Sequence, residues 1–235
     1  KALAIKEKYY GSEHFEVAKT LGNLGNAYGP LGDPQKRKEL LERALPMLEK
    51  HYGSEHFEVA ETLGNLGIAY GALGNPQKSK ELLERALPML EKGYGSEHFD
   101  VATLLVSLGN AYGALGNHQK KKELLEKALA IQEKHYGSEH FEVARALVNL
   151  ASAYGSLGDP QKQKELSERA LAIEKKHYGT EHFKVAATLV KLGHAYRSLG
   201  DLQKMKESLK RALPILERYY GSEHFKVAKT LVNLG

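Results

Sequence analysis

The sequence predicts an all-α protein built from a row of nearly identical helix pairs, and three observations support this. Residues 1–42 align with residues 43–84 without a gap and differ at 10 of 42 positions. Inside each repeat, apolar residues recur at the three-and-four spacing of a helix, and no segment alternates as a strand does. Glycine and proline stand where helices would end and begin. A fixed period between about 20 and 50 residues is typical of an array of stacked units.

A marker serine fixes the repeat boundaries. It recurs every 42 residues, with a threonine in one place, so the 235 residues hold about 5.6 copies. We expect them to form one uninterrupted array over residues 1–235, because repeats are stabilised by their neighbours. The complete units are residues 12–53, 54–95, 96–137, 138–179 and 180–221. Residues 1–10 match the second half of a second helix, and residues 222–235 match a first helix without its partner.

The first helix of a repeat is predicted over residues 54–74. Ser54 is its expected N-cap, since serine before an apolar run accepts a hydrogen bond from the first turn. Gly74 is the expected stop signal. The apolar residues that form the buried stripe are Phe57, Ala60, Leu63, Leu66, Tyr70 and Leu73. The tyrosines at the Tyr70 position, which lie on this stripe in each repeat, are therefore expected in the core.

The second helix is predicted from about residue 76 to residue 93. Asn75 is its expected N-cap, and Pro76 occupies the first helical position, where proline is favoured. Proline inside a helix removes a backbone hydrogen bond, so the second helices should bend near Pro46, Pro88 and Pro214. Pro30 should strain the first helix of the opening repeat in the same way. Glycines in the first helices lower helix propensity and allow a neighbouring backbone to come close.

Composition excludes several classes of protein. Hydrophobic residues make up 42% and charged residues 27%, as in ordinary globular proteins, and cysteine is absent. No apolar run is long enough to cross a membrane and no signal peptide opens the chain, so we expect a cytoplasmic protein by default. The net charge is +5. Lysines on the second helices alternate with glutamates, so a nucleic-acid partner is not expected.

Two histidine patterns invite a chemical interpretation. The Ser54-Glu55-His56 triplet resembles a catalytic set, but it recurs in nearly every repeat, which favours a turn or a cap. His51 and His56 flank a glycine turn and could share a metal, but structural zinc needs four ligands and no cysteine is present. We therefore expect no catalytic residue, no metal and no cofactor.

The spacing of a few residues brings a family into view. Leu66-Gly67, Tyr70, Gly74 and Ala86 resemble the tetratricopeptide repeat (TPR) signature. The period of 42 residues and the G-S-E-H-F-E-V-A segment resemble the kinesin-light-chain and nephrocystin type of TPR. This resemblance covers the whole chain. It implies a right-handed α-solenoid of antiparallel helix pairs that binds protein partners on a concave surface and catalyses nothing.

The chain departs from that family pattern at two places. A phenylalanine such as Phe57 follows each histidine where the family has proline, which adds a ring expected to be buried. At the start of the second helix, a small alanine is replaced by variable residues, most of them polar. We expect this turn to be exposed, because such residues cannot all be buried. The residues at this position are Arg37, Ser79, Lys121, Gln163 and Met205.

The resemblance implies that the first helices line a groove for extended or helical peptides. Asparagines recur on this face, and a carboxamide can donate and accept hydrogen bonds to a peptide backbone. Later repeats add valines and basic residues, so we expect an acidic partner segment with hydrophobic anchors. The candidate groove residues are Asn23, Asn26, Asn65, Ile68, Asn110, Val148, Asn149, Val190, Lys191, His194, Arg197 and Asn233.

Two other functions stay open. The near identity of the repeats favours a structural module that assembles with itself, and apolar residues near both ends would support such contacts. These residues are Ala2, Leu3, Ile5, Leu231 and Leu234. Nucleic-acid binding through lysines of the second helices is the other alternative, and it would show a steep salt dependence.

Overall fold

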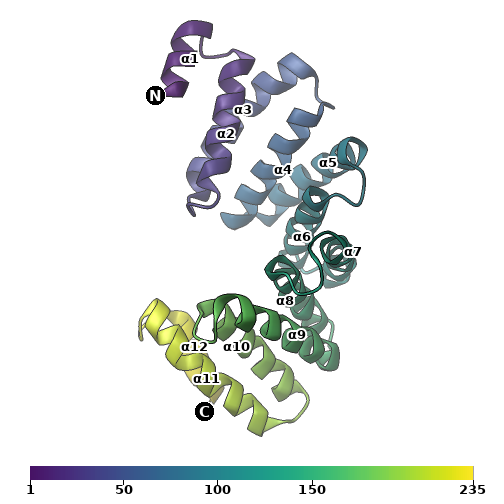
Figure 1. The fold of residues 1–235 in the computed structure, drawn as a ribbon, viewed down its shortest axis with the longest axis vertical. Coiled ribbons are helices and arrows are strands. Elements are labelled where there is room, and N and C mark those ends of the chain that lie inside the picture. Colours follow the sequence, from purple (N-terminus) through teal and green to yellow (C-terminus); the bar gives the residue numbers. More distant parts are fainter. Residues whose placement is uncertain (235) are drawn as a thin grey trace. The chain divides into compact units, whose positions relative to one another are not determined.

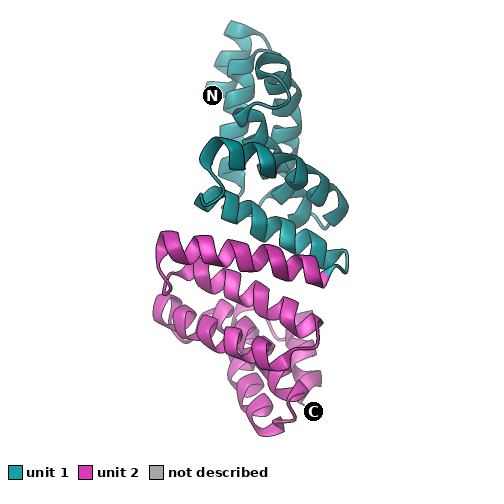
Figure 2. Ribbon diagram, turned by 90° about the vertical axis from the view of Figure 1, so that its right-hand side faces the viewer, with its two compact units in different colours: residues 1–117 teal, residues 118–235 magenta. Residues whose placement is uncertain are grey.

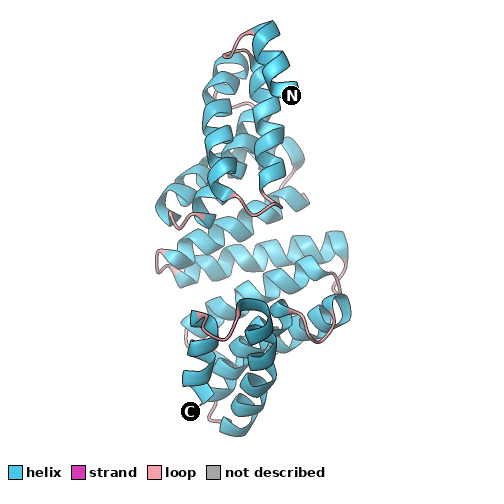
Figure 3. Cartoon of the chain, turned by 90° about the vertical axis from the view of Figure 1, so that its left-hand side faces the viewer, coloured by secondary structure: helices cyan, strands magenta, loops and turns pink. Residues whose placement is uncertain are grey.

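A computed structural model describes residues 1–234, and each regular element in this range is a helix (Figures 1 and 3). Gly235, the last residue of the segment predicted over residues 222–235, lies outside the described residues. None of the helices in the described part is long and apolar enough to cross a membrane. The helices are α1 (Ala2–Tyr10), α2 (Phe15–Tyr28), α3 (Pro34–Tyr52), α4 (Phe57–Ala72), α5 (Pro76–Tyr94), α6 (Phe99–Ala114), α7 (His118–Tyr136), α8 (Phe141–Ser156), α9 (Pro160–Tyr178), α10 (Phe183–Ser198), α11 (Leu202–Tyr220) and α12 (Phe225–Leu234).

The chain forms two compact units, residues 1–117 and residues 118–235 (Figure 2). In the first unit, α2 packs on α3 and α4 packs on α5, and these pairs contact each other through α3 and α4. In the second unit, α8 with α9 and α10 with α11 repeat this arrangement. The fold class predicted from the repeat, an all-α solenoid of helix pairs, is confirmed. A single uninterrupted array over residues 1–235 stays a prediction.

The junction between the two helices of a pair follows the sequence closely. The Asn75 side chain caps α5 by accepting a hydrogen bond from the Lys78 N–H at 3.1 Å, and Pro76 is the first residue of the helix. Gly74 has φ of 76°, a backbone conformation that residues with a Cβ rarely adopt. Glycine thus ends one helix and asparagine begins the next, as predicted.

The junction between successive pairs differs from the prediction. The N-cap of α4 is His56 and not Ser54: the His56 Nδ1 accepts a hydrogen bond from the Glu58 N–H at 3.2 Å. Gly53, at φ of 87°, turns the chain so that the His56 N–H donates to the Gly53 carbonyl, and the helix starts only at Phe57. Ser54 is therefore in the turn, too early in the chain to reach the first free N–H groups.

This arrangement predicts which residue stabilises the start of α4. Replacing His56 with Ala should lower the free energy of unfolding by about 1 kcal/mol, because the Glu58 N–H loses its acceptor. Replacing Ser54 with Ala should change it by a few tenths of a kcal/mol at most. Urea unfolding of both variants measures the difference. Equal losses, or a larger loss for Ser54→Ala, would contradict the histidine cap.

The prolines have different effects at different positions. Pro46, Pro88 and Pro214 lie inside helices of 19 residues that continue past them, and a bend there stays a prediction. Pro30 does not strain a helix as expected. Instead α2 ends at Tyr28 after 14 residues, whereas α4 runs for 16, so the proline shortens the helix.

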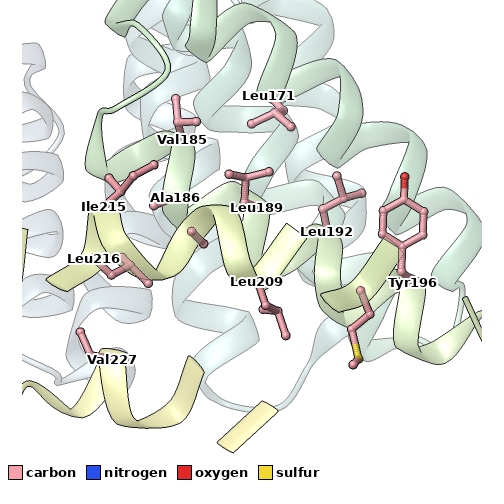
Figure 4. Close-up of a cluster of buried hydrophobic side chains, with 12 residues drawn as sticks. Leu171, Val185, Ala186, Leu189, Leu192, Tyr196, Leu209, Ile215, Leu216 and Val227 are labelled. Carbon is pink, nitrogen blue, oxygen red and sulfur yellow. The ribbon is translucent and has the colours of Figure 1, made fainter. Parts of the chain in front are cut away.

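The apolar stripes of successive helices form the core. In the second unit, Leu189 of α10, Leu209 of α11 and Leu216 of α11 are almost completely buried (Figure 4). Val227 of α12 joins the same cluster. Its side chains come from α9 to α12, so neighbouring helix pairs of the second unit share one core, as expected for repeats that depend on their neighbours.

Glycine in the first helix lets the second helix of the same pair come close. A Cβ on Gly67 would lie 2.8 Å from Leu83 Cγ, and a Cβ on Gly25 would lie 3.0 Å from Leu41 Cγ. One repeat departs from this glycine–leucine combination. It has Ala151 in the glycine position and Ser167 in the leucine position, 84 residues after Leu83, and both are buried. A larger residue on one helix is matched by a smaller one on the other.

The variable residues at the start of the second helix were predicted to be exposed, and this is wrong. Ser79 and Met205 are buried, while Arg37, Lys121 and Gln163 are half-buried. Opposite Ser79, a glycine on the facing helix makes the room: a Cβ on Gly71 would lie 3.1 Å from Ser79 Oγ. Long side chains pass beyond this gap, as when Arg37 Nη2 donates to Asn65 Oδ1 at 2.7 Å. Opposite Met205 the residue equivalent to Gly71 is Arg197, so a glycine does not explain that burial. The close packing of the pair is kept.

The stripe tyrosines are less buried than predicted. Tyr196 is buried, but Tyr28, Tyr70, Tyr112 and Tyr154 are half-buried. Each of the last four tyrosines in the series donates a hydrogen bond to a glutamate 28 residues earlier, on the preceding second helix. The pairs are Tyr70 with Glu42, Tyr112 with Glu84, Tyr154 with Glu126 and Tyr196 with Glu168. These bonds join one helix pair to the next within each unit.

Candidate functional site

Cavities lie between successive first helices within each unit. In the first unit, a cavity of about 200 Å³ between α2 and α4 is lined by Asn23, Asn26 and Asn65. Its other polar lining residues include Lys19, Glu58 and Glu61. Three predicted groove asparagines thus share one cavity. Asn65 already accepts the hydrogen bond from Arg37, whereas Asn23 and Asn26 are exposed.

A second cavity of the first unit lies between α4 and α6. It has a volume of about 460 Å³ and includes the predicted groove residues Ile68 and Asn110. Ser79, at the variable position of the second helix, lines the same cavity beside Gly71, whose missing Cβ leaves room for it. Ser79 therefore contributes to the candidate groove, where sequence reasoning had not placed it.

In the second unit, a cavity of about 350 Å³ between α10 and α12 combines an apolar surface with basic groups. Val190, Leu216 and Phe225 supply apolar surface. None of the described residues that line this cavity is acidic. The basic lining residues are Lys191, His194, Lys226 and Lys229.

A neighbouring cavity of about 270 Å³ lies between α8 and α10. It contains the predicted residues Val148 and Asn149, and it shares Lys226 with the cavity beside it. A residue that sequence reasoning missed also lines it: Glu174 of the second helix α9, which is only 5% exposed. The signal for Glu174 was present in the sequence, because residues 48, 90 and 216 at the same repeat position are leucine.

Burial sets the electrostatics of the predicted basic residues. The Lys191 Nζ donates to Ser152 Oγ at 2.6 Å, and burial lowers the pKa of this lysine. Burial also lowers the pKa of His194, with the charges of Lys229 and Lys191 adding to the effect. His194 Nε2 lies 3.3 Å from Asn233 Nδ2. His194 is thus favoured as a neutral ring, and the lysines carry the positive charge of this cavity.

Two predicted groove residues are placed elsewhere. Arg197 and Asn233 line none of the four cavities described above. Arg197 is exposed near the end of α10, and Asn233 is half-buried on α12 beside His194. The other ten predicted residues line one of these cavities.

The recurring histidines pack in the turns. His51 stacks on Phe15 with ring centroids 3.9 Å apart, and His56 stacks on Tyr52 at 4.4 Å. The Nδ1 of His56 is occupied by the helix cap, so it is not directed at Ser54. No group of three or more histidines and acids suited to a metal ion occurs among residues 1–234.

Comparisons with known proteins agree with this architecture. The tetratricopeptide repeat family matches residues 31–92, 58–120, 100–176, 142–204 and 184–235. A crystal structure of the nearly identical TPR-like repeats assigned to a kinesin light chain of Podosopora anserina is 32% identical. The match covers 88% of this chain and 98% of that one, with a TM-score of 0.69.

Two further structures share the fold at lower identity. BtubC (BKLC) of P. vanneervenii is 23% identical with a TM-score of 0.72, over 88% of this chain and 82% of that one. The MamA protein is 21% identical with a TM-score of 0.57, over 88% of this chain and 96% of that one. No curated protein matches the chain.

Proposed function

This chain belongs to the tetratricopeptide repeat family, and from that premise we propose that it is a protein-interaction scaffold that holds a peptide segment of its partner against the first helices. It catalyses no reaction in this proposal. The repeats of this family generally mediate contacts between proteins. The side chains that differ from one repeat to the next then select the partner.

The observation that carries the proposal is the cavity between α10 and α12. Its apolar surface suits a hydrophobic anchor, and Lys226 and Lys229 suit acidic residues beside that anchor. The cavity between α2 and α4 differs, because Glu58 and Glu61 offset the charge of Lys19. We therefore propose that the second unit binds an acidic segment with hydrophobic anchors. We infer that the first unit binds polar backbone groups of the partner peptide.

A selection of peptides tests this function. Random 12-residue peptides displayed on phage should yield acidic sequences with large apolar residues when selected on the chain. Binding of the selected peptides should weaken about tenfold in Lys229→Glu, since a charge beside the apolar surface is reversed. The control is Lys36→Glu on α3, where an exposed lysine pairs with Glu39 at 3.2 Å, and its affinity should not change.

Two results would contradict the proposal. One is a selection that enriches no peptide. The other is equal weakening by Lys229→Glu and Lys36→Glu, which would indicate attraction by net charge alone. Arg197→Glu separates the two parts of the predicted site, because Arg197 lies outside the cavity and its reversal should have a smaller effect than Lys229→Glu. Lys191→Glu is less informative, since its Nζ bonds to Ser152 inside the fold.

Self-association is a second candidate function, favoured by exposed apolar side chains on α1 and α12. Ile5 is 58% exposed and Val232 is 80% exposed. If these faces join chains, sedimentation velocity at high protein concentration should show dimers or longer species. Ile5→Glu combined with Val232→Glu should then restore the monomer. A monomer at all concentrations would exclude this function.

A further inference from the structure

At the repeat position of Glu174, three other repeats bury a leucine and one buries a glutamine, while the opening segment has the half-buried Lys6. Leu48, Leu90 and Leu216 are 2%, 2% and 3% exposed, and Gln132 is also buried. Leu216 packs in the core beside Val227 (Figure 4). The fold therefore accommodates leucine at this position and does not require a carboxyl group.

The carboxyl of Glu174 is incompletely satisfied. Its Oε2 is buried and has no hydrogen-bond partner among the described residues, while Thr188 lies within hydrogen-bonding reach of the group. Burying a polar atom without a partner is unfavourable by about 1–3 kcal/mol. Gln132 Oε1 at the same repeat position is likewise buried without a partner among the described residues, but Glu174 also lines one of the cavities described above, which makes it the candidate for a role outside the fold.

The cations nearest to Glu174 have other partners. Lys184 Nζ donates to the Tyr178 hydroxyl at 2.9 Å and lies 4.5 Å from the centre of that ring. Lys191 Nζ donates to Ser152, as described above. In the opening repeat, the corresponding positions form an ion pair, Lys6 with Glu16 at 2.8 Å. The equivalent pair of Glu174 and Lys184 is not formed.

The cavity between α8 and α10 gives the carboxyl access to a ligand. Glu174 lines this cavity together with Glu142, Arg145, Lys184 and Lys226, and Arg145 Nη2 pairs with Glu142 Oε2 at 2.6 Å. Lys184 and Lys226 bond to neutral tyrosine hydroxyls, so their charges are not offset by this pair and disfavour a positively charged group from a partner. A negatively charged group is disfavoured at the buried carboxylate itself. An uncharged hydrogen-bonding group is compatible with the surrounding cations and with the buried carboxylate.

We propose that Glu174 is a specificity residue of the groove, and that its free oxygen bonds to the side-chain amide of an asparagine or glutamine in the bound peptide. The inference rests on the proposed function and names one feature of its ligand. A carboxamide both donates and accepts hydrogen bonds, so it matches Glu174 in either protonation state. Burial raises the pKa of Glu174 to about 7, which makes both states accessible near neutral pH.

Peptide selection on three chains tests the inference. Phage-displayed 12-residue peptides are selected on the native chain, on Glu174→Leu and on Gln132→Leu. Gln132 is the matched control, because it is a buried polar residue at the same repeat position of α7 with an unpartnered oxygen of its own, yet it lines none of the four cavities described above. The native chain and Gln132→Leu should both enrich asparagine or glutamine at one peptide position. Glu174→Leu should lose this preference and accept an apolar residue there.

Calorimetry with one selected peptide completes the test. Replacing its amide residue by leucine should weaken binding to the native chain about tenfold, and should leave binding to Glu174→Leu unchanged or stronger. The inference is overturned if all chains enrich the same amide, or if Glu174→Leu is folded by circular dichroism and binds no peptide. A selection that enriches no peptide on any chain overturns the proposed function, and this inference with it.

Discussion

Raising the pH from about 4.5 to about 8 should destabilise the native chain by about 3 kcal/mol more than it destabilises the Glu174→Leu variant. The pKa of Glu174 is about 7 in the folded chain, raised by burial from an ordinary value of 4.5. Between these values the folded chain holds a proton that the unfolded chain has released. The free energy of unfolding therefore falls as the pH rises through this range, and it levels off about one pH unit above the folded pKa.

Urea unfolding at a series of pH values measures this effect. Differences between variants isolate Glu174, because shifts of other groups such as His182 and His194 act equally on both chains. Gln132→Leu is the control: an amide does not titrate, so its effect on stability should be the same at all pH values. Parallel curves for the native chain and Glu174→Leu would show that the carboxyl is satisfied inside the fold.

Replacing Gly67 with Ala should lower the free energy of unfolding by about 1–2 kcal/mol, although alanine is the better helix former. The new Cβ would lie 2.8 Å from Leu83 Cγ, a distance that forces the helices apart or Leu83 out of its rotamer. Such overpacking destabilises by about 1–3 kcal/mol. The higher helix propensity of alanine offsets at most about 1 kcal/mol of this loss.

The repeat with Ala151 and Ser167 supplies the compensating change. In a Leu83→Ser background, Gly67→Ala should be neutral or stabilising, which gives a coupling energy of about 2 kcal/mol in a double-mutant cycle. The reverse experiment starts from Ser167, whose buried Oγ has no hydrogen-bond partner among the described residues. Ser167→Leu should destabilise the native chain, where it faces Ala151, and should stabilise the chain in an Ala151→Gly background. Additive effects in both cycles would contradict the packing argument.

The helices could be predicted from the sequence because their signals are local. Apolar spacing, Gly74 and the Asn75-Pro76 step fixed the ends of α4 and α5 within a few residues. The cap at His56 could not be predicted this way. It depends on the turn made by Gly53, which delays the helix until the histidine ring reaches the free N–H of Glu58.

The candidate site was predicted in part. Counting along the repeat placed residues such as Asn65 and Val190 on helices that line cavities. Ser79, which lines a cavity from the second helix, was missed because its position depends on the missing Cβ of Gly71 in the facing helix. Arg37 reaches Asn65 past such a glycine. Glu174 was overlooked because it lies on a stripe that is apolar in most repeats.

The hydrogen bonds between Tyr70 and Glu42 and their counterparts have a consequence for how such a gene can change. The partners are 28 residues apart each time, less than one repeat. Recombination that inserts or deletes 42 codons therefore keeps the separation of 28 residues, and it keeps the glutamate as well wherever the joined unit carries one and not Lys210, the residue at this position in the last repeat. Copy number can vary between descendants without any new junction having to evolve, whereas an insertion of another length separates the partners.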